Sequence, residues 1–340
     1  MIRIPLVSAL AVLVAVVAPV QAAPFRDTVY KPGNARASAM PIFTWAAPDG
    51  HAIRFKLSPS IGKTLASIGR AQSYALLLES ALHADEMSQL TVQIVRESEM
   101  ADVCGEGALA CYGWDEMVVA YGDIQAAGVG VEEIILHEYG HHLAAHRRNS
   151  LGPAVNWGPQ SWASSESVCF RTDSGRLFPG DQGANYWENP GEGFAEAYAR
   201  YHLPSDRWDY SRLLKPDTRA FSHIEFDAVH RLSEQPSVRT FSGALSRANG
   251  TQSFTLDLPE DTRLQLALDG PAGADYDLRL RTPGYYDERT RAPHARDRLD
   301  TSACAARGSR RRVTIRVKRF KGSGPFELRA RYWDRYEFIG

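Results

Sequence analysis

The chain has 340 residues, a length sufficient for two domains of ordinary size. Hydrophobic residues make up 44% and charged residues 23% of the chain, which is the composition of a globular protein. A formal net charge of −1 excludes a general electrostatic preference for nucleic acids or anionic membranes. We therefore expect no nucleic-acid partner and no stable membrane association.

Residues 1–22 have the organisation of a secretory signal peptide. Arg3 provides a positive charge, Leu6–Val17 is an apolar run, and Val20–Ala22 offers small residues at the cleavage positions. The alternative is an uncleaved N-terminal anchor, but the apolar run is short for a membrane span. We therefore expect export to the periplasm or the extracellular space, with cleavage near Ala22. Residues 23–40 are predicted as an extended arm, too short for a large folded pro-segment.

The segment 41–236 mixes strands and helices and is predicted as one α+β domain. Hydrophobic periodicity predicts strands at His51–Leu57, Leu90–Arg96 and Glu116–Tyr121, and helices at Ile68–His83, Val131–Arg147, Pro190–Tyr201 and His223–Leu232. Between the second and third helices, Asn149–Tyr186 is rich in Gly, Pro, Ser and Trp and is predicted as a long loop.

The segment 237–340 changes to short alternating runs separated by turn residues. These runs predict strands at Gln252–Leu258, Arg263–Leu268, Tyr276–Arg281, Arg312–Lys318 and Phe326–Tyr332. Such a pattern is typical of an antiparallel sandwich or barrel. We therefore expect an α+β domain followed by an all-β sandwich.

Export would allow the four cysteines to form disulfides. Cys104 and Cys111 flank a glycine-rich loop and could close it. Cys169 and Cys304 could pair across the chain or stay free. Four cysteines allow three pairings, and the sequence alone does not choose among them.

The predicted helix Val131–Arg147 contains the motif H-E-x-x-H. On a helix, His137 and His141 project from one face about one turn apart and can bind one Zn²⁺. Glu138 lies beside them and could act on a zinc-bound water. The alternative is a pair of buried histidines satisfied by hydrogen bonds, since three apolar residues directly precede His137.

A catalytic zinc usually takes a third protein ligand. The metzincin arrangement fails because Ala144 and Arg147 stand where Gly and His are required. The stretch GEGFAEAY places Glu192 and Glu196 four residues apart on one face of a later helix. Glu192 would complete the ligand set, and Glu196 would hydrogen-bond a ligand histidine. The alternative for this pair is a solvated helix face.

HEYGHH followed by EGFAEAY resembles the gluzincin metallopeptidases, and the second stretch is similar to that of the lethal-factor-type zinc proteases. The resemblance implies a zincin-like domain with a mixed sheet, the motif helix and a mostly helical second lobe. It also implies that His137, His141 and Glu192 bind zinc and that Glu138 is the general base. The match covers two short segments rather than the whole domain.

Two further expectations come with this resemblance. Lethal-factor-type enzymes have a tyrosine at a similar offset before the third ligand, so Tyr186 is a candidate catalytic donor to the developing oxyanion. Its alternative is a packing aromatic next to Trp187. Glu116–Tyr121 stands where zincins have the edge strand that pairs with extended substrate, and its alternative is an ordinary internal strand.

The stretch from Arg239 to Trp333 resembles the bacterial pre-peptidase C-terminal domain. The resemblance is carried by Ala274–Leu278 (ADYDL) and by Gly322–Leu328 (GSGPFEL). It implies a β-sandwich appended to a secreted peptidase. Asp275 and Asp277 could bind a structural Ca²⁺, although capping of a turn is the alternative.

Together these features predict a secreted, monomeric zinc endopeptidase that acts on a protein or peptide substrate. One catalytic Zn²⁺ is its expected cofactor. Two alternatives remain open at the level of sequence. The protein could hydrolyse a non-peptide amide such as cell-wall material, or it could be a catalytically inactive zincin scaffold used for binding.

Overall fold

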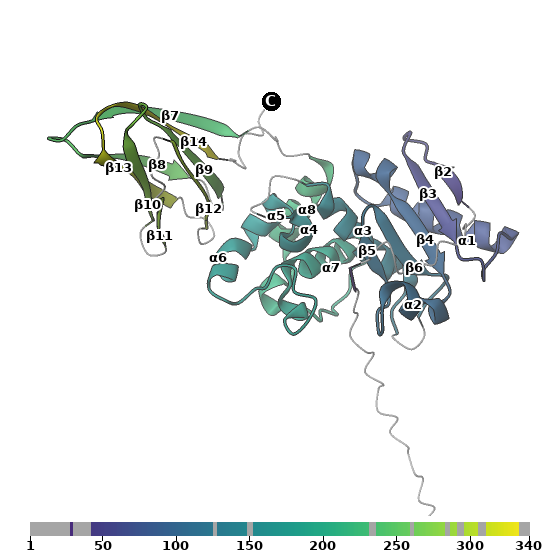
Figure 1. Ribbon diagram of the computed structural model, residues 1–340. Coiled ribbons are helices and arrows are strands. Elements are labelled where there is room, and N and C mark those ends of the chain that lie inside the picture. The colour runs from purple at the N-terminus through teal and green to yellow at the C-terminus, as the bar shows by residue number, and fades with distance from the viewer. Residues whose placement is uncertain are drawn as a thin grey trace, which may run out of the picture.

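The computed structural model describes residues 28–29, 42–124, 128–147, 152–230, 236–258, 262–282, 286–290, 296–304 and 311–332 (Figure 1). The predicted signal peptide, residues 1–22, lies outside the described residues, as does most of the predicted arm. No helix in the described part of the chain is long and apolar enough to cross a membrane.

The N-terminal part contains a six-stranded mixed sheet with the order β1-β5-β6-β4-β3-β2. Its strands are β1 (Thr28–Val29), β2 (Ile42–Ala46), β3 (Ala52–Leu57), β4 (Thr91–Val95), β5 (Cys111–Gly113) and β6 (Glu116–Ala120). The central strands β3, β4 and β6 are parallel, whereas β2 and β5 run antiparallel to their neighbours β3 and β6. Every residue of β4 is buried, as expected for a parallel strand with both faces covered.

The prediction that Glu116–Tyr121 forms the edge of the sheet is wrong. Strand β6 lies between β4 and β5, and the sheet continues through β5 to β1. Thr28 and Val29 of β1 pair in parallel with Cys111 and Tyr112 of β5. Strand β5 has three residues, too few to show an alternating pattern in the sequence.

The helices cover the sheet and form a second lobe. The longer ones are α1 (Leu65–Ser80), α3 (Val131–Ala145), α7 (Pro190–His202) and α8 (Thr218–Val229). The short ones are α2 (Met100–Cys104), α4 (Ala154–Trp157), α5 (Gln160–Ser165), α6 (Val168–Asp173), η1 (Asp85–Gln89), η2 (Glu97–Glu99), η3 (Tyr186–Glu188) and η4 (Arg212–Leu214). Figure 1 shows α3 between the sheet on one side and the group α4–α8 on the other.

The prediction of one long loop over Asn149–Tyr186 is wrong in part, because the described residues include α4, α5 and α6, whereas residues 174–185 contain no helix or strand. Some of the Pro and Gly residues lie at the ends of these helices, whereas Pro179 and Gly183 lie in the irregular segment 174–185. Pro153 and Pro159 are the N-cap residues of α4 and α5, and Gly158 ends α4 with a φ of +76°. Helices of four to six residues are too short for a recognisable helical period.

The C-terminal part consists of two four-stranded antiparallel sheets, β11-β10-β13-β8 and β12-β9-β14-β7. The strands are β7 (Ser237–Leu245), β8 (Thr251–Leu258), β9 (Thr262–Asp269), β10 (Asp275–Thr282), β11 (Tyr286–Arg289), β12 (Arg296–Ala303), β13 (Arg311–Lys321) and β14 (Gly324–Tyr332). Apolar residues of both sheets, such as Leu278 and Leu328, share one buried core, separate from the core of the N-terminal part. The structure thus has the expected α+β part followed by an all-β part.

Two disulfides join the four cysteines. Cys104–Cys111 closes the loop between α2 and β5, as the sequence suggested. Cys169–Cys304 connects α6 to the residue that follows β12, across a sequence separation of 135 residues. The second disulfide is therefore a covalent link between the N-terminal and C-terminal parts.

This link predicts that the two parts stay joined when the chain between them is cut. A protease-recognition sequence inserted between Gln235 and Pro236 should, after cleavage, give one species on a non-reducing denaturing gel and two species after reduction. The same cleavage in a Cys304→Ser variant should give two separate fragments without reductant. Separation of the fragments without reductant in the parent protein would contradict the assigned disulfide.

A buried ion pair fixes the C-terminal end of α3. The guanidinium of Arg147 lies 3.1 Å from the carboxylate of Glu86 and donates to the backbone carbonyls of Asp227 and Ala228. Burial raises the pKa of Glu86, but the charge of Arg147 and the backbone N–H of Ala84 outweigh it and hold this pKa below its ordinary value. Arg147 thus ties α3 to η1 and to α8.

We expect Glu86→Gln to destabilise the protein by about 3 kcal/mol, because it leaves the charge of Arg147 buried without its carboxylate. A carboxyl whose pKa is lowered by folding contributes stability above its unfolded pKa and loses it as the pH falls through the folded value. The parent protein should therefore lose stability below about pH 4. The Glu86→Gln variant should lack the part of this loss that comes from protonation of Glu86. Urea unfolding at several pH values measures both effects. The matched control is Glu97→Gln, at an exposed glutamate.

Candidate metal centre

Helix α3 carries the two histidines of the H-E-x-x-H motif into the interior. Twelve of its residues are buried, among them Ile134, Ile135 and Leu136, so the helix is covered on nearly all sides. Two acidic residues, Glu132 and Glu133, occupy its first turn, where the helix dipole favours negative charge.

Helix α7 supplies the two glutamates. Asn189 caps its N-terminus by accepting a hydrogen bond from the N–H of Gly191, and Pro190 follows at the first helical position. Glu192 and Glu196 retain 2% and 3% of their accessible surface, so the alternative of a solvated helix face is wrong. The sequence pattern for a helix here is confirmed, and the helix is buried rather than exposed.

The two helices approach closely at a glycine in the middle of the motif. A Cβ atom at Gly140 would lie 2.8 Å from the Cα of Ala195 on α7, a distance that side chains do not adopt. Because the backbones are this close, residues four apart on α3 face residues four apart on α7. Gly140, one of the two variable residues of the H-E-x-x-H motif, is therefore required by the packing of α3 against α7.

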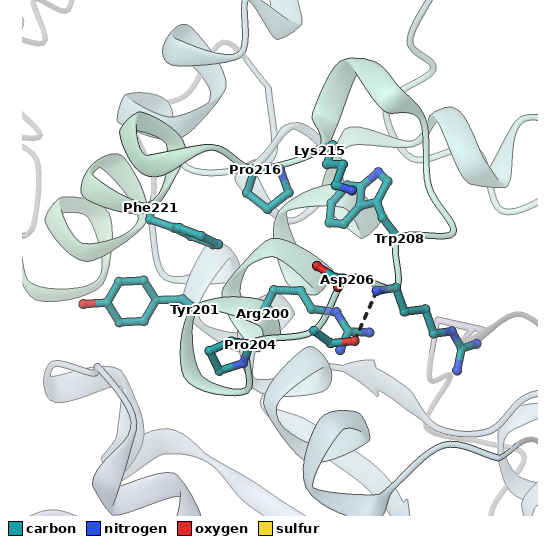
Figure 2. A pocket seen from close by; sticks show the side chains of 10 residues that line it. Arg200, Tyr201, Pro204, Asp206, Trp208, Lys215, Pro216 and Phe221 are labelled. Carbon is teal, nitrogen blue, oxygen red and sulfur yellow. Dashed lines mark hydrogen bonds between the residues drawn. The ribbon is translucent and has the colours of Figure 1, made fainter.

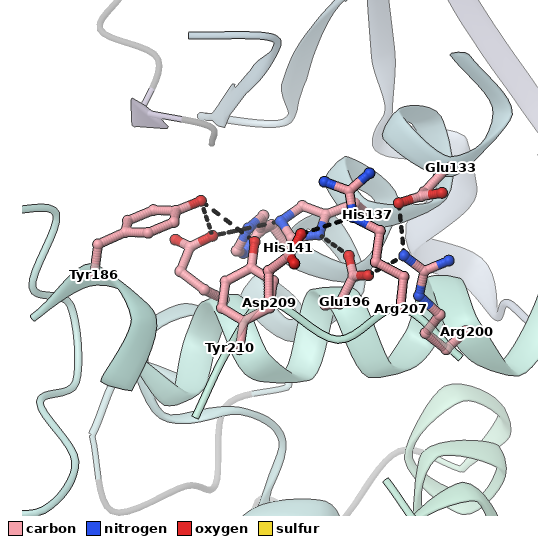
Figure 3. A network of polar contacts seen from close by, with 10 residues as sticks. Glu133, His137, His141, Tyr186, Glu196, Arg200, Arg207, Asp209 and Tyr210 are labelled. Atoms are coloured by element: carbon pink, nitrogen blue, oxygen red, sulfur yellow. Dashed lines mark hydrogen bonds and ion pairs between the residues drawn. The ribbon is translucent and has the colours of Figure 1, made fainter. Parts of the chain in front are cut away.

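Three potential ligand atoms meet between the helices. Figure 3 shows two of the residues that supply them, His137 and His141. The Oε2 atom of Glu192 lies 3.4 Å from Nε2 of His137 and 3.3 Å from Nε2 of His141. One ligand atom from each of these three residues lies within 4.8 Å of the others, and all three side chains are buried. Two imidazole nitrogens and one carboxylate oxygen are the donor set of many catalytic zinc sites, which keep a fourth position open. The residues present therefore fit a zinc ion.

Glu196 contacts the opposite side of His137. Its Oε2 atom lies 3.1 Å from Nδ1 of His137, and its Oε1 atom lies 2.5 Å from the guanidinium of Arg200, which also contacts Glu133 at 2.6 Å. Burial raises the pKa of Glu196, but His137 and Arg200 together hold it below its ordinary value. An ionised Glu196 accepts the proton of Nδ1 and leaves the Nε2 lone pair of His137 directed towards Glu192. This is the contact predicted for Glu196.

Tyr186 lies inside the site. Its hydroxyl donates to Oε2 of Glu192 at 3.2 Å and lies 3.4 Å from the hydroxyl of Tyr210, while its ring packs edge-on against Trp187 at 4.8 Å. The packing next to Trp187 is thus present, and the catalytic role of the hydroxyl stays a prediction. Glu138 is fully buried on α3, next to His137.

Several residues around the cluster were not identified from the sequence. Gln182 donates to Oε1 of Glu192 at 2.7 Å, the ring of Tyr210 stacks on His137 at 6.1 Å, and the ring of Tyr112 stacks on His141 at 6.4 Å. Arg200 could have been found, because it stands four residues after Glu196 on the same helix. Gln182, Tyr112 and Tyr210 lie outside any motif and carry no such signal.

A cavity of about 610 Å³ lies beyond the end of α7 (Figure 2). Its lining includes Arg200, Trp208, Lys215 and Phe221, but none of the three candidate ligands. Arg200 is shared between this cavity and the network behind His137.

Asp275 and Asp277, the candidate calcium ligands, lie on β10. Among the described residues, neither belongs to a cluster of side chains able to hold a metal ion. The calcium site stays a prediction that depends on the sequence resemblance alone.

No protein-family model matches the chain, and no curated protein matches it. Among solved structures, the pre-peptidase C-terminal domain of a collagenase from Bacillus anthracis matches with 16% identity over 27% of this chain and 87% of that domain, at a TM-score of 0.24. The Aeromonas hydrophila inhibitor PliG of g-type lysozyme matches with 12% identity over 30% of this chain and 92% of its own, at a TM-score of 0.23.

A mitogen derived from Yersinia pseudotuberculosis matches with 14% identity over 31% of this chain and 91% of its own, at a TM-score of 0.22. The likeness to a pre-peptidase C-terminal domain is thus weak and of low coverage.

The geometry predicts unequal effects for the two glutamates of α7. Glu196→Ala removes a contact to a ligand histidine and should lower zinc affinity about 10–100-fold. Glu192→Ala removes a ligand and should lower it by more than about 100-fold. Competition with a chromophoric chelator measures both affinities. The reverse order would assign the ligand to Glu196.

Proposed function

We propose that the N-terminal part of the chain is a zincin-like domain of gluzincin type and that the protein is a secreted zinc endopeptidase. The observation that carries this proposal is the convergence of His137, His141 and Glu192 from α3 and α7, with Glu138 buried beside them. The mixed sheet, the motif helix and the helical second lobe are the layers that this proposal requires (Figure 1).

Each residue of the site has a role in this proposal. A bound zinc ion would polarise the scissile carbonyl and make water more acidic. The carboxylate of Glu138 would accept a proton from the attacking water and deliver it to the leaving amine. Glu196 and Arg200 would hold the His137 ring in place, and the Tyr186 hydroxyl, near Glu192, would donate a hydrogen bond to the developing oxyanion.

Two disulfides support an oxidising compartment outside the cytosol, in line with the predicted signal peptide. For the C-terminal part we propose a β-sandwich of the pre-peptidase C-terminal type. This assignment depends on the ADYDL and GSGPFEL stretches and on the two antiparallel sheets that contain them.

We expect Glu138→Gln to abolish cleavage of casein or of a fluorogenic peptide while zinc content stays unchanged, because zinc binding needs the ligands and not the base. Metal analysis and a cleavage assay on the secreted protein measure the two quantities. The matched control is Glu132→Gln, the same change at an exposed position of α3, which should leave both unchanged.

Three other outcomes would each contradict the proposal. Cleavage that survives Glu138→Gln would exclude the mechanism. Release of amide products from cell-wall material, without peptide cleavage, would indicate the non-peptide hydrolase. A protein that binds zinc and hydrolyses neither substrate would indicate a binding scaffold.

A further inference from the structure

Helix α3 carries a second pair of histidines four residues apart, which the proposed active site does not use. His142 is fully buried, and the side chain of His146, at the C-cap, is 13% exposed. On the helix they project away from the pair His137 and His141. They meet Asp115, which lies in the turn between β5 and β6.

The three side chains bring a carboxylate oxygen and two imidazole nitrogens together. Oδ1 of Asp115 lies 2.8 Å from Nε2 of His146 and 3.7 Å from Nδ1 of His142, and the three ligand atoms all lie within 4.8 Å of one another. Ligand atoms around a tetrahedral zinc ion are separated by about 3.3 Å, given metal–ligand distances near 2.0 Å. The two distances from Asp115 lie on both sides of that value, and the Asp115 side chain is 44% exposed.

The tautomer of His142 is set by a backbone carbonyl. Its Nε2 atom lies 2.8 Å from the carbonyl oxygen of Glu86, which can only accept a hydrogen bond, so Nε2 carries the proton. The Nδ1 lone pair then points towards Asp115 and the hydroxyl of Tyr112, which is 3.1 Å away. A histidine that donates its other N–H to a carbonyl is the usual form of a metal ligand.

The turn that presents Asp115 has an unusual backbone. Trp114 and Asp115 have φ values of +56° and +61°, the left-handed region at both positions, where hairpins normally place Asn and Gly. The carbonyl of Asp115 accepts from the N–H of Thr91 at 2.8 Å, which fixes the turn against the start of β4. This arrangement places Asp115 beside the C-terminal end of α3, where its carboxylate contacts His146.

We propose that Asp115, His142 and His146 form a second site for a divalent transition-metal ion, Zn²⁺, which joins the β5–β6 turn to the C-terminal end of α3. Imidazole and carboxylate ligands suit zinc, and the partly exposed Asp115 and His146 leave one side open to water. This site shares no ligand with the proposed active site.

Another cluster offers a control. Asp49, His51 and His83 also bring ligand atoms within 4.8 Å of one another. Asp49 is exposed, and its carboxylate lies 3.8 Å from His51 and 3.4 Å from His83. Nδ1 of His83 is buried without a hydrogen-bond partner among the described residues, so this ring lacks the carbonyl contact that sets the tautomer of His142.

The test counts zinc on the full-length secreted protein after equilibrium dialysis against buffered Zn²⁺. We expect two zinc ions per chain in the parent protein and one in His146→Ala and in Asp115→Ala, with peptide cleavage retained in both. His83→Ala should still bind two. The Glu192→Ala variant should bind one zinc ion, at the second site. The second site can therefore be detected even if the proposed active site binds no zinc.

Thermal unfolding provides a second measurement that does not depend on activity. In the Glu192→Ala background, Zn²⁺ should raise the Tm by several degrees, because a ligand that binds only the folded state stabilises it. Adding His146→Ala should remove that rise while leaving the Tm in chelator unchanged within a few degrees. The proposal would be overturned if the parent chain bound a single zinc ion that Glu192→Ala removes and His146→Ala does not affect. A rise in Tm that persists in the double variant would also overturn it.

Discussion

The close contact between α3 and α7 is the constraint on which the candidate metal centre depends. Gly140 allows the backbone of one helix to lie against Ala195 of the other, and no larger residue fits there. At this separation the pairs His137/His141 and Glu192/Glu196 face each other directly. If larger residues separated the two helices to the usual interaxial distance of 8–10 Å, these side chains would lie farther apart. A backbone contact thus sets the geometry of the ligands.

Burial of charge is the second constraint. Glu192 and Glu196 bring two carboxylates into a region from which water is largely excluded, which is costly unless each charge is compensated. Arg200 contributes one positive charge, and it is itself held by Glu133 at the start of α3. A divalent cation between the two histidines and Glu192 would offset the remaining negative charge. The same electrostatic reasoning explains why Arg147 and Glu86 occur together at the other end of α3.

Much of this arrangement follows from local spacing. The i,i+4 pairs on α3 and α7 could be placed from the sequence because helical periodicity alone puts them on one face. Strands β8, β9, β10, β13 and β14 were predicted from their alternating pattern, whereas β7, β11 and β12 were not predicted. Strand β5 could not be predicted because three residues are too few to show alternation, and Gln182 and Tyr210 could not because they lie outside any motif. The helices α4–α6 were missed because Pro and Gly at helix ends resemble Pro and Gly in loops.

The position of β1 has a consequence for the edge of the sheet. Thr28 and Val29 occupy the outer side of β5, the strand whose Tyr112 stacks on His141. An extended peptide that pairs with β5 from that side must displace a segment belonging to the same molecule. Such an attached competitor acts at an effective concentration set by the connecting chain, not by the amount of protein in solution. Diluting the protein would therefore not expose the outer side of β5, whereas cutting the chain between β1 and β2 would allow β1 to dissociate from it.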